Sequence, residues 1–256
     1  MRGKRALVTG ASRGLGLAIA RGLAAEGCDL VLSARDAERL AGVEDAIRQK
    51  YDVAVSSVAG DLSRREDQDK LVDLVGVPDI VVNNAGANPA GEIDEVTEEV
   101  WRSAWDLKVF GYIALTRAFY TRMKARGDGV ILNIIGVAGE RMNPRYILGS
   151  AGNSALMSLT RALGGRSPDF GVRVLGVNPG LTATERATTM LQTWSQQRFG
   201  TPDRGTEVLT SMKLPFGRMG TPEEVADLVA FLVCPRASYM SGTIVTIDGG
   251  AANREA

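Results

Sequence analysis

Residues 5–23 read RALVTGASRGLGLAIARGL and run from an apolar segment through a glycine-rich turn into a helical pattern. The segment from Arg5 to Thr9 predicts a β-strand, and the apolar positions after Gly14 recur at helical spacing. A glycine turn between strand and helix lets the backbone approach a pyrophosphate and points the helix N-terminus at its negative charge. We therefore expect phosphate contacts from Gly10, Ser12, Arg13, Gly14, Leu15 and Gly16.

The rest of the chain alternates short aliphatic runs with longer amphipathic segments, which is typical of a parallel sheet covered by helices on both faces. Strands are expected at residues 5–9, 29–33, 53–57, 79–82, 129–135, 172–177 and 243–247. Helices are expected at residues 14–26, 37–50, 64–75, 97–126, 150–166 and 222–233. This pattern predicts an α/β fold, a Rossmann-like doubly wound sheet of seven parallel strands, as a single dinucleotide-binding domain over residues 1–256.

Composition excludes several classes of function. The chain has 30 basic and 30 acidic residues, so no net field draws it to nucleic acid or to an anionic membrane. No apolar run approaches the length of a membrane span, and the two cysteines resemble buried thiols of a reducing compartment, so we expect a cytoplasmic protein. Because there is no histidine, Ser-His-Asp and Cys-His nucleophiles and histidine metal sites are absent, and no metal is expected.

Further motifs follow the glycine turn in a fixed order. The turn has the spacing TGxxxGxG, and it is followed by Asp61, by the run 83–86 (NNAG), by 178–180 (NPG) and by 247–250 (IDGG). Together these motifs resemble the short-chain dehydrogenase/reductase family over essentially the whole chain. The resemblance implies a nicotinamide cofactor, a small organic substrate and a homotetramer or homodimer. It also implies cofactor contacts from Asp61, Leu62, Asn83, Ala85, Gly86, Pro179, Gly180, Thr182 and Thr184.

The end of the second strand indicates which nicotinamide cofactor is bound. An acid there would bind the adenosine ribose and repel a 2′-phosphate, but this chain has Ala34 followed by Arg35. Arg13 adds a second guanidinium, and guanidinium groups bind phosphate through bidentate hydrogen bonds. The sequence therefore favours NADP(H) over NAD(H), although Arg35 as a solvated helix-end charge stays an open alternative.

The catalytic positions depart from the family pattern. Members of the resembled family carry an Asn, a Ser and a Tyr-x-x-x-Lys motif, in which the lysine lowers the pKa of the tyrosine. Alignment of the flanking segments places Lys108, Gly136, Gly149 and Asn153 at these four positions.

Two hypotheses follow from this departure. In the first, Tyr146 and Lys108 rebuild the proton-donating pair, with Asn153 or Ser150 as hydrogen-bond donors, in an oxidoreductase that interconverts a carbonyl and an alcohol. In the second, the chain binds the dinucleotide without redox activity, as a sensor, a non-redox enzyme or an assembly partner. Lys108 as a surface charge and Tyr146 as an aromatic cover of the core edge are the simpler alternatives.

Substrate specificity is expected from three loops, at residues 87–93, 140–148 and 181–220. The last of these is a long irregular stretch. We expect it to be a lid over the binding site, or otherwise a surface excursion or a subunit contact.

Overall fold

The computed structural model describes residues 1–86 and 88–254. Ala87 of the expected substrate loops and the last two residues of the expected domain therefore lie outside the described residues. One parallel sheet has the strand order β3-β2-β1-β4-β5-β6-β7, which confirms the predicted doubly wound α/β fold. Its strands are β1 Arg5–Thr9, β2 Asp29–Ala34, β3 Val55–Ala59, β4 Ile80–Asn83, β5 Gly129–Ile134, β6 Val172–Pro179 and β7 Ile244–Ile247.

Strand β3 begins two residues later than the sequence predicts, at Val55. The carboxylate of Asp29 accepts a hydrogen bond of 2.8 Å from the backbone N–H of Ala54, and the pairing with β2 starts at Leu30 and Val55. The preceding residues form a tight turn in which the N–H of Val53 donates to the carbonyl of Tyr51. Val53, the predicted start of the strand, therefore lies in this turn and not in β3.

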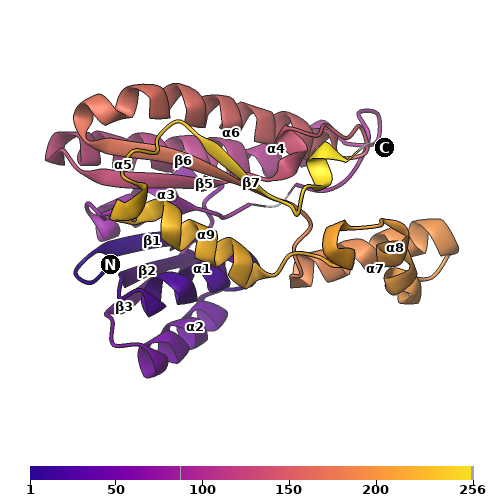
Figure 1. Cartoon of the computed structure of the whole chain (residues 1–256), viewed down its shortest axis with the longest axis horizontal. Helices are drawn as coiled ribbons and strands as arrows, with labels where there is room; N and C mark the ends of the chain where they lie inside the picture. Colours follow the sequence, from indigo (N-terminus) through magenta and orange to yellow (C-terminus); the bar gives the residue numbers. More distant parts are fainter. Residues whose placement is uncertain (87, 255–256) are drawn as a thin grey trace.

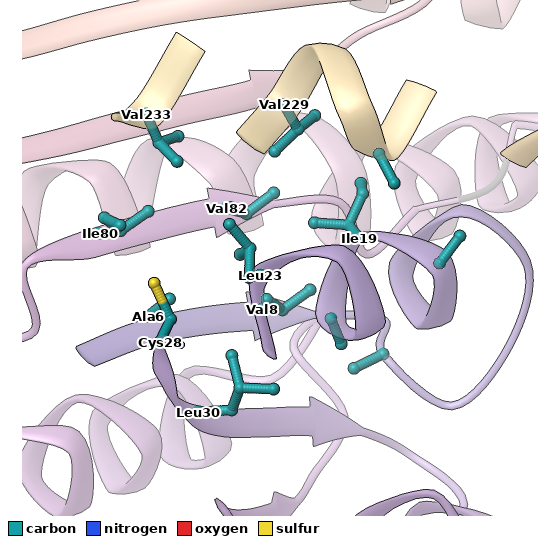
Figure 2. Close-up of a cluster of buried hydrophobic side chains, with 14 of the residues drawn as sticks. Ala6, Val8, Ile19, Leu23, Cys28, Leu30, Ile80, Val82, Val229 and Val233 are labelled. Carbon is teal, nitrogen blue, oxygen red and sulfur yellow. The ribbon is translucent and has the colours of Figure 1, made fainter. Parts of the chain in front are cut away.

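Helices cover both faces of the sheet (Figure 1). One face carries α1 Gly14–Ala25, α2 Ala37–Lys50 and α9 Pro222–Val233, and the other carries α3 Arg65–Val75, α5 Gly111–Arg126 and α6 Ile147–Arg166. Side chains of β1 alternate between the two faces, as strand geometry requires. Ala6 and Val8 pack toward α1 and α9, as Figure 2 shows, while Leu7 lies in the cluster on the opposite face.

The expected helix at 97–126 is divided. It consists of α4 Glu98–Trp105, a π-helical turn at Asp106–Phe110 and α5. A π turn places one extra residue in the helix and often marks a functional site. Here it carries Lys108, whose side chain is buried.

The segment between β6 and α9 is more ordered than the sequence suggested. It contains α7 Glu185–Phe199 and α8 Gly205–Ser211, which project beyond the rest of the molecule (Figure 1). Backbone hydrogen bonds from Ala183 to Gly220 (2.8 Å) and from Gly220 to Leu181 (3.0 Å) hold its two ends together. We call residues 181–220 the lid segment.

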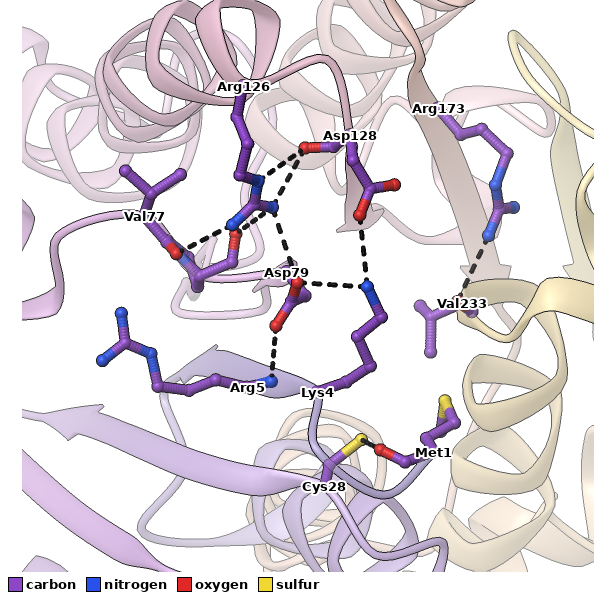
Figure 3. A network of polar contacts seen from close by, with 11 residues as sticks. Met1, Lys4, Arg5, Cys28, Val77, Asp79, Arg126, Asp128, Arg173 and Val233 are labelled. Atoms are coloured by element: carbon purple, nitrogen blue, oxygen red, sulfur yellow. Dashed lines mark hydrogen bonds and ion pairs between the residues drawn. The ribbon is translucent and has the colours of Figure 1, made fainter.

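A network of ion pairs and hydrogen bonds joins the amino ends of the strands, at the edge of the sheet opposite the glycine turn (Figure 3). The ammonium group of Lys4 lies 3.2 Å from both the Asp79 and the Asp128 carboxylates, and the N–H of Arg5 donates to Asp79 at 2.8 Å. Arg126 pairs with Asp79 at 3.6 Å. The expected cofactor residues follow the carboxyl ends of β1, β4 and β6, at the opposite edge of the sheet.

In residues 1–86 and 88–254, no helix is long and apolar enough to cross a membrane.

Candidate active site

The glycine turn after β1 forms a cradle of backbone. Gly10 and Gly14 have φ of +66° and +55°, values that other residues rarely adopt. A Cβ atom on Gly16 would lie 2.2 Å from the carbonyl oxygen of Gly10, so only glycine fits there. Within the described chain, Arg13 at the N-cap of α1 provides no side-chain cap for the first N–H groups of that helix. These features fit a bound pyrophosphate, because free N–H groups at a helix N-terminus bind anions.

The crevice for such a ligand lies between β1 and β4, where the strand order reverses. The hydroxyl of Thr9 accepts hydrogen bonds from the N–H groups of Asn84 (2.9 Å) and Ala85 (3.0 Å). The Asn84 amide in turn donates to the Thr9 carbonyl at 2.9 Å. Thr9 and Asn84 thus hold together the loops that follow β1 and β4, although neither residue is among the expected contacts.

Asp61 and Arg35, two of the expected cofactor contacts, lie near one another. Burial opposes ionisation of Asp61, but hydrogen bonds from the N–H (3.0 Å) and hydroxyl (2.8 Å) of Ser63, together with the charge of Arg35, hold its pKa below the usual value. Asp61 is therefore a carboxylate at neutral pH. Leu62 is only 3% exposed and packs in the core, so its side chain is largely unavailable to a ligand.

The side chain of Asn83 does not fit the expected cofactor contact. Its side chain is completely buried, and its amide donates to the Thr116 hydroxyl (3.1 Å) and to the Asn133 carboxamide oxygen (2.9 Å). The side chain faces the interior because it pairs with a polar residue of the neighbouring strand. At Asn83 only the backbone is therefore available to contact a cofactor. The next expected contacts, Ala85 and Gly86, are half-buried.

An ion-pair cluster joins the glycine turn to the lid segment. Glu185, in the first turn of α7, pairs with Arg13 at 3.6 Å and with Arg39 of α2. Arg39 also donates to the carbonyl of Ser12 at 3.1 Å. Two guanidinium groups therefore lie beside the glycine turn, one of them not foreseen from the sequence.

The last four of the expected cofactor residues form the base of the lid segment. Pro179 ends β6, and the N–H of Gly180 donates to Ile247 at 2.9 Å. The hydroxyl of Thr182 donates to the carbonyl of Gly180 at 3.1 Å. Thr184 caps α7 by accepting a hydrogen bond from the N–H of Ala187 at 3.3 Å. Both hydroxyls are thus engaged in holding the start of the lid segment.

Tyr146 occupies the space in front of Gly149. A Cβ atom on Gly149 would lie 1.8 Å from Cε1 and 2.2 Å from Cζ of the Tyr146 ring. Tyr146 precedes the first residue of α6, and its backbone is bridged to Gly91 of the loop that follows β4. Its hydroxyl accepts a hydrogen bond of 3.2 Å from Arg186 of α7.

Lys108 is buried and not a surface charge. Its Nζ donates to the carbonyl of Ile135 at 2.6 Å, and its stem fills the space beside Gly86, where a Cβ atom would lie 2.9 Å from the lysine Cβ. Burial, and then the positive charge of Arg186, lowers the pKa of Lys108 to about 7. In the described residues no hydrogen bond joins Lys108 to Tyr146. The cation that touches the Tyr146 hydroxyl is Arg186.

The two expected hydrogen-bond donors of α6 differ in availability. Ser150 accepts from the N–H of Asn143 at 2.9 Å and donates to its carbonyl at 3.3 Å, so its hydroxyl serves to fold the preceding loop. Asn153 donates to the carbonyl of Gly136 at 3.2 Å, and its buried Oδ1 has no partner in the described chain. Gly136 has φ of +119°, a conformation that strains any side chain.

Comparison with known proteins identifies the family. A family profile described as "Enoyl-(Acyl carrier protein) reductase" matches residues 10–252. Dehydrogenase/reductase SDR family member 4 of Caenorhabditis elegans is 31% identical over 98% of this chain and 96% of that protein. The chain belongs to the short-chain dehydrogenase/reductase (SDR) family. It is thus related to oxidoreductases that bind a nicotinamide cofactor.

Other SDR relatives act on sugars. A galactitol 2-dehydrogenase (L-tagatose-forming) of Cereibacter sphaeroides is 33% identical over 97% of this chain and 94% of that protein. The crystal structure of L-sorbose reductase from Gluconobacter frateurii, complexed with NADPH and L-sorbose, superposes with a TM-score of 0.92 at 32% identity. That match covers 100% of this chain and 98% of the other.

Arg186 and Asn88 lie beside Tyr146 and are not among the residues expected from the sequence. Arg186 donates to the carbonyl of Asn88 at 2.8 Å as well as to Tyr146. The available signal was an arginine in the first turn of a helix, where the helix dipole disfavours positive charge.

In residues 1–86 and 88–254, no group of three or more His, Cys, Asp or Glu could hold a metal ion.

Proposed function

We propose that this SDR chain is an NADP(H)-dependent oxidoreductase that interconverts a carbonyl and an alcohol on a small organic substrate, with Tyr146 as proton donor and acceptor. The observation that carries the proposal is the Tyr146 ring in front of Gly149. Alignment places Gly149 where other SDR enzymes have their tyrosine. A phenol that starts three residues earlier thus fills the space of the missing side chain.

When bound, a nicotinamide cofactor supplies or accepts the hydride at the substrate carbon. Tyr146 donates its hydroxyl proton to the substrate oxygen in the reductive direction. The guanidinium of Arg186, already 3.2 Å from this hydroxyl, stabilises the negative charge left on the phenol oxygen. Arg186 thereby performs the function first assigned to Lys108.

Asn153 and Lys108 support the same site less directly. Asn153 holds the backbone at Gly136 through its amide N–H. Lys108 packs beneath Gly86 and contributes positive charge when protonated. Ser150 shapes the loop before Tyr146 through Asn143, and we assign it no contact with substrate.

The preference for NADP(H) rests on charge at the mouth of the cradle. Ala34, at the end of β2, brings no acid to the ribose. Arg13, Arg35 and Arg39 are all exposed on the loops and helix that follow β1 and β2. Guanidinium groups in this arrangement favour a 2′-phosphate, and the NADPH complex of the related L-sorbose reductase agrees with that preference.

The test compares the wild type with Tyr146→Phe in NADPH-dependent reduction of a panel of small aldehydes and ketones. The variant should lose at least about 100-fold in kcat while its NADPH affinity stays unchanged, because general acid catalysis contributes about 10²–10⁴-fold. Tyr239→Phe removes a hydroxyl from a fully exposed tyrosine and is the control.

Full turnover by Tyr146→Phe would contradict the role of Tyr146. NADPH binding by the wild type without turnover of any carbonyl or alcohol would favour the alternative of a dinucleotide-binding protein without redox activity.

A further inference from the structure

The positive charge of Arg186 has no acidic partner in the described part of the chain. Its guanidinium donates to the carbonyls of Asn88 (2.8 Å) and Gly86 (3.5 Å) and to the Tyr146 hydroxyl (3.2 Å), all of which are uncharged. The adjacent Glu185 is already paired with Arg13 and Arg39. Arg186 is therefore a cation held in place beside the proposed proton donor without being neutralised.

Lys108 places a second positive group near the first. Its amine is buried and donates to a backbone carbonyl, that of Ile135. The charged side chain that influences its pKa is Arg186, which has the same sign. When Lys108 is protonated, two cations share one region. Arg186 is exposed, whereas Lys108 is buried, and burial makes the lysine charge costly unless an opposite charge is present.

Asn88, whose backbone binds Arg186, has a buried side-chain amide without partners in the described chain. Asn88 is 3% exposed, and neither Nδ2 nor Oδ1 has a hydrogen-bond partner in the described chain. Its backbone carbonyl is the oxygen that binds Arg186 at 2.8 Å. Buried side-chain amides are nearly always paired, so an unpaired amide in the residue that binds a guanidinium without an acidic partner indicates a missing ligand group.

Resting on the oxidoreductase function proposed above, we propose that the substrate is a short oxo acid, or the corresponding hydroxy acid, whose carboxylate is bound by Arg186 and Asn88. A guanidinium with an amide N–H is a donor set suited to a planar carboxylate. Because Arg186 also contacts the Tyr146 hydroxyl, the carboxylate and the reacting oxygen must lie close together. The carboxyl carbon is then about one or two carbons from the carbonyl, given ordinary hydrogen-bond lengths.

The experiment compares acids with their neutral esters. Pyruvate, 2-oxobutanoate and acetoacetate are each offered with NADPH beside the corresponding methyl ester, and the ratio of kcat/KM for acid to ester is measured. The wild type should prefer the acids by at least about 30-fold, since charge-assisted hydrogen bonds are strong. Arg186→Gln should bring that ratio close to unity, and Arg186→Lys should keep part of it.

Two further variants separate charge from structure. Asn88→Asp places a negative charge beside the guanidinium and should lower kcat/KM for the acids at least about tenfold more than for the esters. Arg198→Gln removes an arginine farther along α7, where it donates to the Ser211 hydroxyl, and should leave the ratio unchanged.

The outcomes distinguish this inference from the proposed function. Turnover of neutral esters or ketones with no preference for acids, or an acid preference that survives Arg186→Gln, overturns the carboxylate site and leaves the oxidoreductase in place. Calorimetric binding of the oxo acids to the wild type, lost in Arg186→Gln but without turnover, supports the site and contradicts the oxidoreductase. Absence of both binding and turnover of the acids overturns the inference.

Discussion

A single methyl group added at Gly149 should displace the Tyr146 ring without altering its chemistry. The new Cβ atom of Gly149→Ala would lie 1.8 Å from Cε1 of the ring. Ordinary carbon contacts are about 3.5–4.0 Å, so the ring must move by roughly 2 Å. The hydroxyl moves with it and leaves the position where Arg186 donates to it at 3.2 Å.

Two opposing effects set the change in the free energy of unfolding of Gly149→Ala, and the displacement of the ring sets the change in kcat. Alanine is the better helix former, by about 1 kcal/mol, whereas overpacking costs about 1–3 kcal/mol. The net change in the free energy of unfolding should therefore be a destabilisation of no more than about 2 kcal/mol. Displacement of a reacting group by 1 Å or more lowers turnover about 100-fold.

The assay measures kcat for carbonyl reduction, NADPH affinity and the urea midpoint of each variant. Gly165→Ala, in the same helix with no heavy atom within 4 Å of the new Cβ, is the matched control and should be slightly stabilised and fully active. A Gly149→Ala variant that folds, binds NADPH and keeps kcat within twofold of the wild type would refute the placement of Tyr146 at the reacting centre.

Three other changes test the remaining parts of the site. Lys108 keeps its proton up to about pH 7 when folded but up to about 10.5 when unfolded, so the unfolded state binds more protons between these values and stability should rise with pH. In urea unfolding from pH 7 to 10, the free energy of unfolding of the wild type should rise by roughly 1 kcal/mol per pH unit relative to that of Lys108→Met. If the two free energies change in parallel with pH, the lowered pKa is contradicted. Glu185→Gln frees the two arginines beside the glycine turn and should tighten NADPH about two- to fivefold but not NADH, as fluorescence titration of both can check. Gly16→Ala forces a Cβ to 2.2 Å from backbone and should weaken NADPH at least about 100-fold in calorimetry, whereas Gly42→Ala, with open space around the new Cβ, should bind normally.

The backbone conformation at the expected cofactor residues could be predicted because its constraints are local. The turn needs glycine at three positions, for a positive φ at Gly10 and Gly14 and for a close backbone approach at Gly16. The spacing of glycines between strand and helix therefore predicts the turn. Reversal of strand order between β1 and β4 follows from the doubly wound topology, which brings Gly86 to the same edge. The backbone at these residues was therefore predictable, whereas the inward-facing side chain of Asn83 was not.

The catalytic half was only partly predictable. Tyr146 and Gly149 are three residues apart at the start of a helix, a separation at which side chains meet, so the replacement of one by the other could be proposed from spacing. Lys108 was placed on the right helix, but its burial depends on a π turn that periodicity does not reveal. The hydroxyl of Ser150 is engaged by Asn143, a contact that exists only once the loop has folded.

By itself the sequence determined the fold and the glycine turn after β1, because hydrophobic periodicity and glycine conformation act between near neighbours in the chain. Tertiary structure alone decided which cation meets Tyr146. Arg186 is 40 residues away in sequence and reaches the hydroxyl only because the lid segment starts beside the carboxyl edge of the sheet. Packing between distant segments set that contact, and no local spacing rule describes it.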